Sequence, residues 1–287
     1  MTPEPIFRRN FDDPEEQDRA DLQESIIRQV EADPVSFLAK YEQDPRSFNG
    51  RYIAADLFKE MFAEYAKSKE TRTRYNAVVH NAAAVLSALQ LNMVIADPAR
   101  YGFEVLFLTG IPGAGKTSTV AVAGDLAPEI RAIFEGQLSR PEPAIPKIQA
   151  VLEAGLKPVI IAVHTKPEQA LENTFKRFEE MGRGASINIM ADIQGNLPTG
   201  LMSIRNRFGN AVGLTVIDRT DFKMPIEKRG WEHLITLQKE GNYEQIRQRL
   251  ADALEHARRE GRISGDCFEQ ASGRVPQNFA RNPGVAG

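Results

Sequence analysis

The residues with the clearest chemistry lie between positions 110 and 118, which read Gly-Ile-Pro-Gly-Ala-Gly-Lys-Thr-Ser. The spacing G-x-x-x-x-G-K-[ST] lets backbone N–H groups turn inward onto an anion, and the helix that follows adds its positive end. In such a loop Lys116 reaches the β- and γ-phosphates of a nucleotide, and the Thr117 hydroxyl is placed for Mg²⁺. The apolar run at 105–108 and the helical pattern at 117–123 supply the strand and helix that the motif requires. The sequence therefore predicts a phosphate-binding loop formed by Gly110, Ile111, Pro112, Gly113, Ala114, Gly115, Lys116, Thr117 and Ser118.

Length and composition exclude several classes of protein. The 287 residues, 42% of them hydrophobic, can bury one substantial core. The net charge of −3 gives no basic footprint, so we expect no nucleic-acid partner. A single cysteine, Cys267, excludes an internal disulfide framework and any zinc cluster. The N-terminus lacks the apolar core of a signal peptide, and we expect no apolar run of membrane-spanning length, so the predicted location is cytoplasmic, with no membrane partner.

Strands and helices are expected to alternate around the phosphate loop. Strands are predicted at 51–56, 105–108, 130–134, 157–163 and 212–217, and helices at 57–65, 74–95, 145–154 and 168–180, with a further helical stretch to about residue 208. Around the phosphate-binding loop, this order predicts a P-loop α/β fold, a parallel sheet with helices on both faces. We expect a P-loop core at 51–225, preceded by a helical extension at 1–50 with helices at 18–32 and 34–41. A C-terminal helical segment at 226–272 and a disordered tail at 273–287 would follow.

Four features together resemble the zeta toxin family, P-loop kinases whose best-known members phosphorylate the sugar 3′-hydroxyl of UDP-N-acetylglucosamine with ATP and Mg²⁺. The first is the phosphate loop. The second is Ile-Phe-Glu-Gly-Gln at 133–137, similar to the family's apolar-Glu/Asp-Gly-Thr strand end. The third is the helical stretch 174–179 with Arg177, and the fourth is Gly-Arg-Gly at 182–184. The last two are similar to a family helix with an active-site arginine and to the mobile arginine segment behind it.

One part of the family pattern is missing from its usual place. In the family, the strand after the phosphate-loop helix ends on the catalytic aspartate, but here only about twenty residues separate Lys116 from Glu135. The stretch 52–60, Tyr-Ile-Ala-Ala-Asp-Leu-Phe-Lys-Glu, looks like the missing block and lies upstream of the loop. We therefore predict a rearranged strand order. Since sites in open α/β sheets lie beyond the carboxyl ends of the strands, Asp56, the loop and Glu135 should still converge.

The resemblance implies catalytic roles for Asp56, Lys116, Arg177 and Arg183. Asp56 would accept the proton of the acceptor hydroxyl, although an aspartate at this place is also suited to cap a helix N-terminus. Arg177 and Arg183 would stabilise charge on the transferred phosphoryl group, or else be ordinary surface arginines. Flanking glycines suit Arg183 to a segment that closes.

Four further residues are predicted to face the acceptor. Glu135 would hold substrate hydroxyls and is the fallback base, while Gln137 stands where the family commonly has threonine. Lys59, one helical turn after Asp56, would meet a phosphate or carboxylate, or face solvent. His80 either borders the pocket or is a buried histidine of the core. Thr117 is the only metal ligand that we predict, because no other spacing suits a metal and Mg²⁺ should arrive with the nucleotide.

The implied function is a toxin, an ATP- and Mg²⁺-dependent kinase of a nucleotide sugar, with GTP as an alternative to ATP. Two other functions stay open: a kinase for another hydroxyl acceptor, a dinucleotide or an antibiotic, and a non-catalytic nucleotide-binding interaction module. Family toxins are restrained by a helical antitoxin, so the expected partners include an antitoxin or, in cis, the acidic helices of residues 11–50. Those helices alternatively only pack on the core or bind another subunit.

Overall fold

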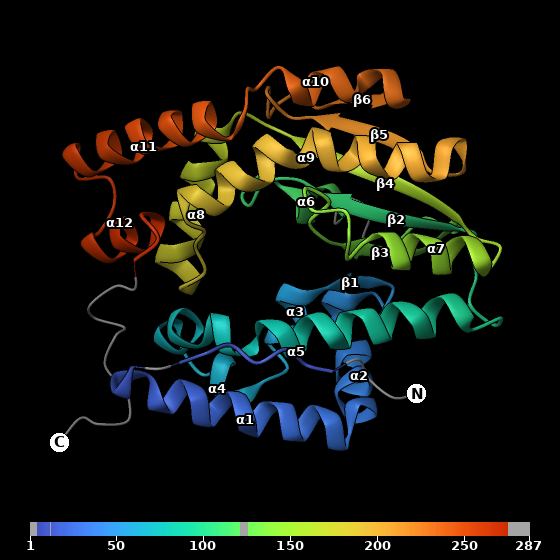
Figure 1. The fold of residues 1–287 in the computed structure, drawn as a ribbon, viewed down its shortest axis with the longest axis horizontal. Helices are drawn as coiled ribbons and strands as arrows, with labels where there is room; N and C mark the ends of the chain where they lie inside the picture. The colour runs from blue at the N-terminus through green and yellow to red at the C-terminus, as the bar shows by residue number, and fades with distance from the viewer. Residues whose placement is uncertain (1–4, 12, 121–125, 275–287) are drawn as a thin grey trace.

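The computed structural model describes residues 5–11, 13–120 and 126–274. They form a six-stranded sheet flanked by helices, with strand order β1-β3-β2-β4-β5-β6 (Figure 1). The first five strands are parallel, and β6 pairs antiparallel with β5. Their bounds are β1 Tyr52–Ala54, β2 Glu104–Thr109, β3 Ile130–Glu135, β4 Lys157–His164, β5 Gly213–Asp218 and β6 Ile226–Arg229. The predicted parallel α/β fold is confirmed, whereas β6 was not predicted, because its four residues are charged or exposed and show no buried face.

Twelve α-helices accompany these strands in the described residues: α1 Gln17–Ala32, α2 Pro34–Gln43, α3 Ala55–Lys59, α4 Ala63–Ala66, α5 Lys69–Ala96, α6 Lys116–Val120, α7 Ile145–Glu153, α8 Pro167–Met181, α9 Ile187–Phe208, α10 Leu234–Gln238, α11 Tyr243–Arg259 and α12 Gly265–Ala271. The single helix predicted at 57–65 is wrong. It is interrupted because Phe62 adopts an extended conformation and is buried together with Met61. Residues 121–123 of the predicted loop helix and 275–287 of the predicted tail lie outside the described residues.

The sheet brings three chain segments to one edge. In the register of β1 and β2 with β3, Ala54 and Leu108 both lie opposite Glu135, at the carboxyl end of each strand. The chain continues into α3 from β1 and into the phosphate loop from β2. The predicted rearrangement is thus confirmed, because β1 comes first in the chain but takes the outer position beside β3.

Helix α2 supports this short outer strand. The Tyr41 hydroxyl donates to the carbonyl of Tyr52 at 2.7 Å and accepts from the N–H of Ala54 at 3.1 Å. It thereby satisfies backbone groups that another strand would otherwise bond. The Tyr41 ring is fully buried and stacks on Phe58 of α3, with centroids 3.6 Å apart. One side chain of the N-terminal extension therefore fixes both β1 and the helix that follows it.

Helix α5 is the longest element and the centre of the N-terminal half. It begins at a capping box of Ser68 and Thr71 and packs against α1, α3 and α4 and against the strands β1 and β3. The expectation that no segment is long and apolar enough to cross a membrane is wrong for this helix, because charged residues are few beyond its first turns. Within the fold, however, 61% of its apolar window is buried, as in a core helix.

Helix α1 is joined to α5 by a largely buried ion pair. The guanidinium of Arg74, 3% exposed, donates to both carboxylate oxygens of Asp18 at 2.7 and 2.6 Å, and the Tyr75 hydroxyl donates to Asp18 at 2.9 Å. In Figure 1, α1 lies on the side of α5 away from α6, where the phosphate loop ends. The structure thus favours packing, rather than inhibition, as the role of the N-terminal helices.

Replacing Asp18 by Asn should lower the free energy of unfolding by about 2–3 kcal/mol, because it removes the negative charge that forms two hydrogen bonds with the buried Arg74 guanidinium. Burial opposes ionisation of Asp18, but the bonds from Arg74 and Tyr75 outweigh it and hold the pKa below its ordinary value. The stabilisation should therefore be complete above the unfolded-state pKa and be lost as the pH falls through the lower folded-state pKa.

Urea unfolding of the parent and variant across this pH range is the measurement. Glu24→Gln is the matched control, since Glu24 pairs with Arg8 in an exposed ion pair that solvent screens and that should contribute little to stability. Equal destabilisation by the two variants would show that the Asp18 pair does not hold α1 to α5.

Candidate active site

The phosphate loop is packed directly on β4 and α8. Gly110, Gly113 and Gly115 have φ angles of +143°, +84° and +83°. A Cβ atom at Gly110 would lie 2.4 Å from the Val163 carbonyl oxygen, and one at Gly113 would lie 2.2 Å from the Ala170 carbonyl oxygen. The glycines are therefore required both by backbone conformation and by space. The loop keeps its shape through its neighbours, and its backbone forms a cradle that fits a phosphate group.

Lys116 lies between the loop and the end of β3. Its Nζ donates to the carbonyls of Gly110 at 3.0 Å and Ile111 at 3.3 Å, and lies 3.5 Å from Oε1 of Glu135. The other Glu135 oxygen accepts from the Tyr52 hydroxyl at 2.6 Å, and Tyr52 also contacts Thr117. Burial and the adjacent Glu135 raise the pKa of Tyr52, so this hydroxyl stays protonated as a donor. The end of β1, the end of β3 and the loop are thus joined by polar contacts.

Asp56 lies in the first turn of α3, two residues beyond β1, and gathers three cations. Its carboxylate is 3.0 Å from Lys59 Nζ, 2.7 Å from Arg183 Nη2 and 3.5 Å from Arg177 Nη2. Burial raises the pKa of Asp56, but the charges of Lys59 and Arg183, and then of Arg177, outweigh it and hold the pKa far below its usual range. The four residues predicted from three separate motifs are therefore in direct contact.

The helix-capping alternative for Asp56 is not what the structure shows. The N-cap position of α3 is Ala54, without a side-chain cap bond, and the Asp56 carboxylate contacts the three cations instead. Its side chain is still 49% exposed, so a bound substrate could reach it. The ion pairs, and not a local backbone bond, fix its position.

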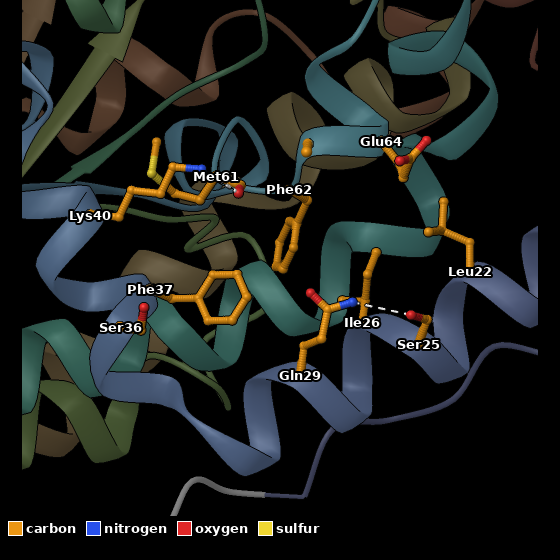
Figure 2. A pocket seen from close by; sticks show the side chains of 11 residues that line it. Leu22, Ser25, Ile26, Gln29, Ser36, Phe37, Lys40, Met61, Phe62 and Glu64 are labelled. Carbon is orange, nitrogen blue, oxygen red and sulfur yellow. Dashed lines mark hydrogen bonds between the residues drawn. The ribbon is translucent and has the colours of Figure 1, made fainter.

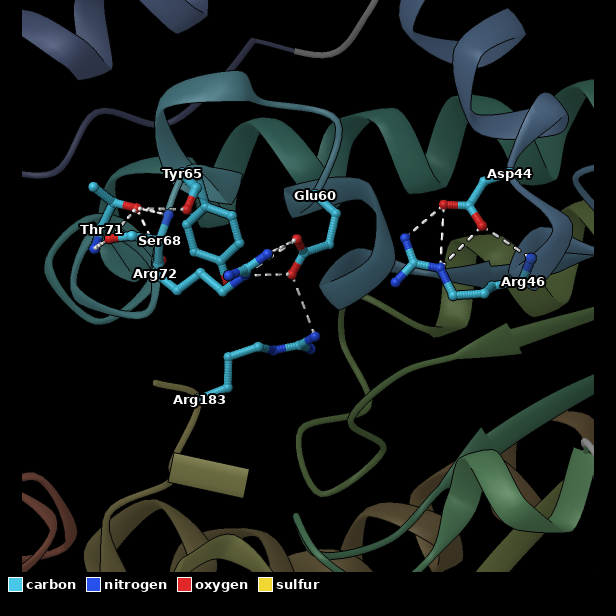
Figure 3. A network of polar contacts seen from close by, with 8 residues as sticks. All are labelled: Asp44, Arg46, Glu60, Tyr65, Ser68, Thr71, Arg72 and Arg183. Carbon is cyan, nitrogen blue, oxygen red and sulfur yellow. Dashed lines mark hydrogen bonds and ion pairs between the residues drawn. The ribbon is translucent and has the colours of Figure 1, made fainter. Parts of the chain in front are cut away.

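Arg183 is held on a second carboxylate, Glu60 (Figure 3). Its Nη1 lies 3.6 Å from Glu60, which also binds Arg72 at 2.9 Å. The preceding Gly182 has a φ of +69°, and its carbonyl accepts from the Thr73 hydroxyl at 2.8 Å. A Cβ atom at Gly182 would lie 2.2 Å from the Lys69 carbonyl oxygen. The Gly-Arg-Gly segment is thus docked on the first turns of α5.

The remaining predicted residues differ in their surroundings. Lys59 Nζ, besides its pair with Asp56, donates to Asn76 Oδ1 of α5 at 2.8 Å. His80, one helical turn after Asn76, is exposed and is not the buried core histidine of the alternative interpretation. The surrounding protein, followed by the charges of Lys59 and Arg9, lowers the pKa of His80 to about 4, so its imidazole is neutral at pH 7. Gln137 is exposed just beyond β3.

A hollow of about 480 Å³ lies away from this cluster, between α1, α2 and the turn after α3 (Figure 2). Its wall includes Met61 and Phe62, and Lys40 Nζ donates to the Met61 carbonyl at 3.0 Å. None of the predicted site residues lines it. Because phosphate chemistry needs the loop and its cations, we place the site at the sheet edge and not in this hollow.

The comparison with protein families agrees with this geometry. Residues 127–226 match the family model described as Zeta toxin. The zeta toxin segment contains Glu135, Gln137, Arg177 and Arg183, whereas Asp56, Lys59 and the phosphate loop lie upstream of it. The resemblance is thereby confirmed over this segment and supports a kinase-type phosphotransferase. Asp56 and the phosphate loop lie outside the matched segment, and side-chain contacts join them to Arg177, Arg183 and Arg219 within it.

A search among solved structures finds similarity to the native AvrRxo1-ORF1:-ORF2 complex. The TM-score is 0.42 with 12% sequence identity, and the match covers 79% of this chain and 92% of that chain. No curated protein matches.

Arg219 is a site residue that the sequence analysis missed. It follows β5, and its Nη1 donates to the Ser118 hydroxyl at 2.7 Å and the Gly115 carbonyl at 3.1 Å. Its guanidinium also lies over the Phe222 ring, 5.2 Å from the centroid. The signal was its place at the carboxyl end of a predicted strand, which also drew attention to Asp56 and Glu135. Arg219 thus connects the zeta toxin segment with the phosphate loop.

The hydrogen-bond donors of the loop and its neighbours fit a nucleoside triphosphate with Mg²⁺. Loop N–H groups, Lys116 and Arg219 offer positive charge around one cradle, and the side chain of Thr117, which contacts Tyr52, is exposed to a cation from solvent. The described residues contain no group of three His, Cys, Asp or Glu side chains suited to a metal. Thr117 and the nucleotide phosphates are therefore the ligands expected for Mg²⁺.

Arg219→Gln should weaken binding of Mg·ATP about tenfold, because it removes a charge and the bonds that fix Gly115 and Ser118. Isothermal titration with the non-hydrolysed ATP analogue AMP-PNP measures the effect. The control is Arg229→Gln, since Arg229 is 82% exposed and pairs only locally, with Glu227. Equal affinities of the two variants would show that Arg219 does not support the nucleotide site.

Proposed function

We propose that this chain is a toxin, a kinase that transfers the γ-phosphoryl group of ATP to a hydroxyl of a nucleotide sugar such as UDP-N-acetylglucosamine. The observation that carries the proposal is the contact of Asp56 with Arg177 and Arg183 at the sheet edge that also holds the phosphate loop. A phosphoryl transfer site needs these parts: a cradle for the donor, cations for the transferred group and a carboxylate for the acceptor hydroxyl. The zeta toxin match over residues 127–226 supports the same reaction.

The donor half of the site follows from the loop. Backbone N–H groups of the loop bind the β-phosphate, and Lys116 leaves its loop carbonyls to contact the β- and γ-phosphates. Thr117 would hold the Mg²⁺ that arrives with the nucleotide, and the ion would neutralise phosphate charge. Glu135, bonded by Tyr52 and 3.5 Å from Lys116, would accept hydrogen bonds from acceptor hydroxyls.

The acceptor half depends on Asp56. Arg177 and Arg183 pair with this carboxylate, and the phosphate oxygens of a bound nucleotide would compete with it for both guanidinium groups. The acceptor oxygen forms its bond to the γ-phosphorus, the bond from phosphorus to the ADP oxygen breaks, and the hydroxyl proton passes to Asp56. Lys59, buried and bonded to Asn76, stays with Asp56 and keeps it in place.

Gln137 occupies the position where the family commonly has threonine. The acceptor could therefore differ from that of the family, and other acceptors are included in the test. A dinucleotide or an antibiotic with a free hydroxyl is the second candidate, with the same donor half and the same base. The predicted antitoxin partner, the cytoplasmic location and the domain division at residues 50, 225 and 272 stay predictions.

Asp56→Asn and Lys116→Ala should each reduce transfer at least about 100-fold, because they remove the proton acceptor and the phosphate-binding cation. Labelled Mg·ATP is incubated with UDP-N-acetylglucosamine, NAD and an aminoglycoside, and the labelled product is identified. Asp21→Asn, an exposed substitution on α1, is the control and should match the parent. Labelling of NAD or the antibiotic without UDP-N-acetylglucosamine would overturn the nucleotide-sugar assignment.

The same variants test whether phosphoryl transfer is the toxic activity. Expressed in bacteria, the parent and Asp21→Asn should slow growth, whereas Asp56→Asn and Lys116→Ala should not. Growth inhibition by both inactive variants equal to that of the parent would support a nucleotide-binding interaction module instead.

The low pKa of Asp56 predicts the pH dependence. Asp56 should be ionised in the free enzyme at any pH above its ordinary value of 3.8, so kcat/KM should show no acid limb from this group above that pH. Arg183→Gln removes one of the charges that lower the pKa, and should raise it and move any acid limb to higher pH. A profile of kcat/KM against pH measures both; an acid limb that is the same in parent and variant would contradict this assignment.

A further inference from the structure

Asn76 on α5 is joined to the Asp56 cluster by a shared cation. Its Oδ1 accepts from Lys59 Nζ at 2.8 Å, and the same nitrogen lies 3.0 Å from Oδ1 of Asp56. Lys59 is only 4% exposed, so its ammonium group is held between these two oxygens. Because both oxygens contact one nitrogen, a single sugar ring with its substituents is large enough to touch Asn76 and Asp56 together.

The same face of α5 also holds the arginine segment. Thr73 precedes Asn76 by three residues and therefore lies on the same side of the helix. Its hydroxyl donates to the Gly182 carbonyl at 2.8 Å, and the following residue, Arg183, pairs with Asp56 at 2.7 Å. Contacts from α3 and from the arginine segment thus meet at Asp56 beside one face of α5. This face borders the space that an acceptor must enter to reach Asp56.

The contact with Lys59 determines how the Asn76 amide is turned. A lysine ammonium group has three donors and no acceptor, so it must meet the amide oxygen and not the amide nitrogen. The Nδ2 group therefore points away from Lys59, and the Asn76 side chain is exposed. Within residues 5–11, 13–120 and 126–274, no hydrogen bond from this nitrogen occurs. Two oriented N–H donors are thus available to a ligand beside Asp56.

The next side chain on this face of α5 is uncharged. His80 follows Asn76 by one helical turn and is exposed. Its imidazole is neutral at pH 7, because the surrounding protein and then the charge of Lys59 lower its pKa to about 4. Neutral donors suit hydroxyl and carbonyl oxygens, whereas phosphate oxygens are better matched by lysine and arginine side chains. This face of α5 is therefore suited to the uncharged polar part of an acceptor.

We propose that Asn76 is a specificity-determining residue of the acceptor site, and that its Nδ2 group donates to a hydroxyl or carbonyl oxygen next to the hydroxyl that Asp56 receives. The inference rests on the proposed function and deepens it. Sugars carry oxygens on neighbouring carbon atoms, so one oxygen can lie at Asp56 while the next meets Asn76. This hydrogen bond is present before and during transfer, so it should contribute to KM and hardly to kcat.

The test compares Asn76→Asp and Asn76→Ala with the parent in steady-state kinetics. The acceptor is the one that the parent uses among UDP-N-acetylglucosamine, NAD and an aminoglycoside. Asn76→Asp keeps an oxygen for Lys59 but removes both donors, and Asn76→Ala removes the amide without adding a charge. Each should raise the KM for the acceptor about tenfold, because a hydrogen bond to the acceptor is lost. The KM for ATP should not change, and kcat of Asn76→Asp should stay close to that of the parent.

Asn92→Asp is the matched control. It makes the same substitution at an exposed position of the same helix, about 24 Å further along the helix axis. It should have the KM and kcat of the parent, which would show that a new negative charge on α5 is not by itself the cause of an effect.

The outcomes separate this inference from the function on which it rests. If Asn76→Asp has the acceptor KM of the parent while Asn76→Ala is impaired, Asn76 acts only by holding Lys59. The inference is then overturned and the kinase remains. A rise in the KM for ATP as large as the rise for the acceptor would also overturn it. Transfer by the parent to none of the three acceptors would contradict the proposed function, and the inference with it.

Discussion

The bonds of the Tyr41 hydroxyl to β1 are the contact on which the site depends. A three-residue strand forms few ladder bonds, and β1 has a sheet neighbour on one side only. Tyr41 bonds the groups on its free side, at Tyr52 and Ala54, and its ring packs on Phe58 of α3. Asp56 lies between these fixed points, so its distance from the phosphate loop is set by a helix of the N-terminal extension. The extension is therefore part of the catalytic framework.

Opposite charges are paired throughout the site. Lys59, Arg177 and Arg183 surround Asp56, and Glu60 and Glu135 hold further cations nearby. Such a cluster neutralises itself, which keeps several partly buried charges in acceptable surroundings. In the proposed reaction, phosphate oxygens would replace the carboxylate as partners of the arginines with similar geometry. The cations would then stay paired, and Asp56 would become available to the acceptor.

The sequence predicted the parts of the site that short motifs encode. The spacing of residues 110–118 identified the loop, and the strand end before Asp56 identified its position at the sheet edge, although it lies early in the chain. Features that depend on distant contacts were missed. Arg219 follows a predicted strand, but its bond to the phosphate loop depends on the pairing of β5 with β4, which no short motif encodes. The break between α3 and α4 follows from burial of Met61 and Phe62, and β6 follows from pairing with β5, neither of which local periodicity reports.

The order of elements along the chain divides the site into two halves. Asp56 and Lys59 precede the phosphate loop, whereas Arg177, Arg183 and Arg219 follow it. The two halves meet through the side-chain pairs of Asp56 with Arg177 and Arg183. In the proposed reaction, a phosphate that binds these arginines would act on the junction of the two halves as well as on Asp56. Transfer would then require donor and acceptor together to replace the contacts that join the halves.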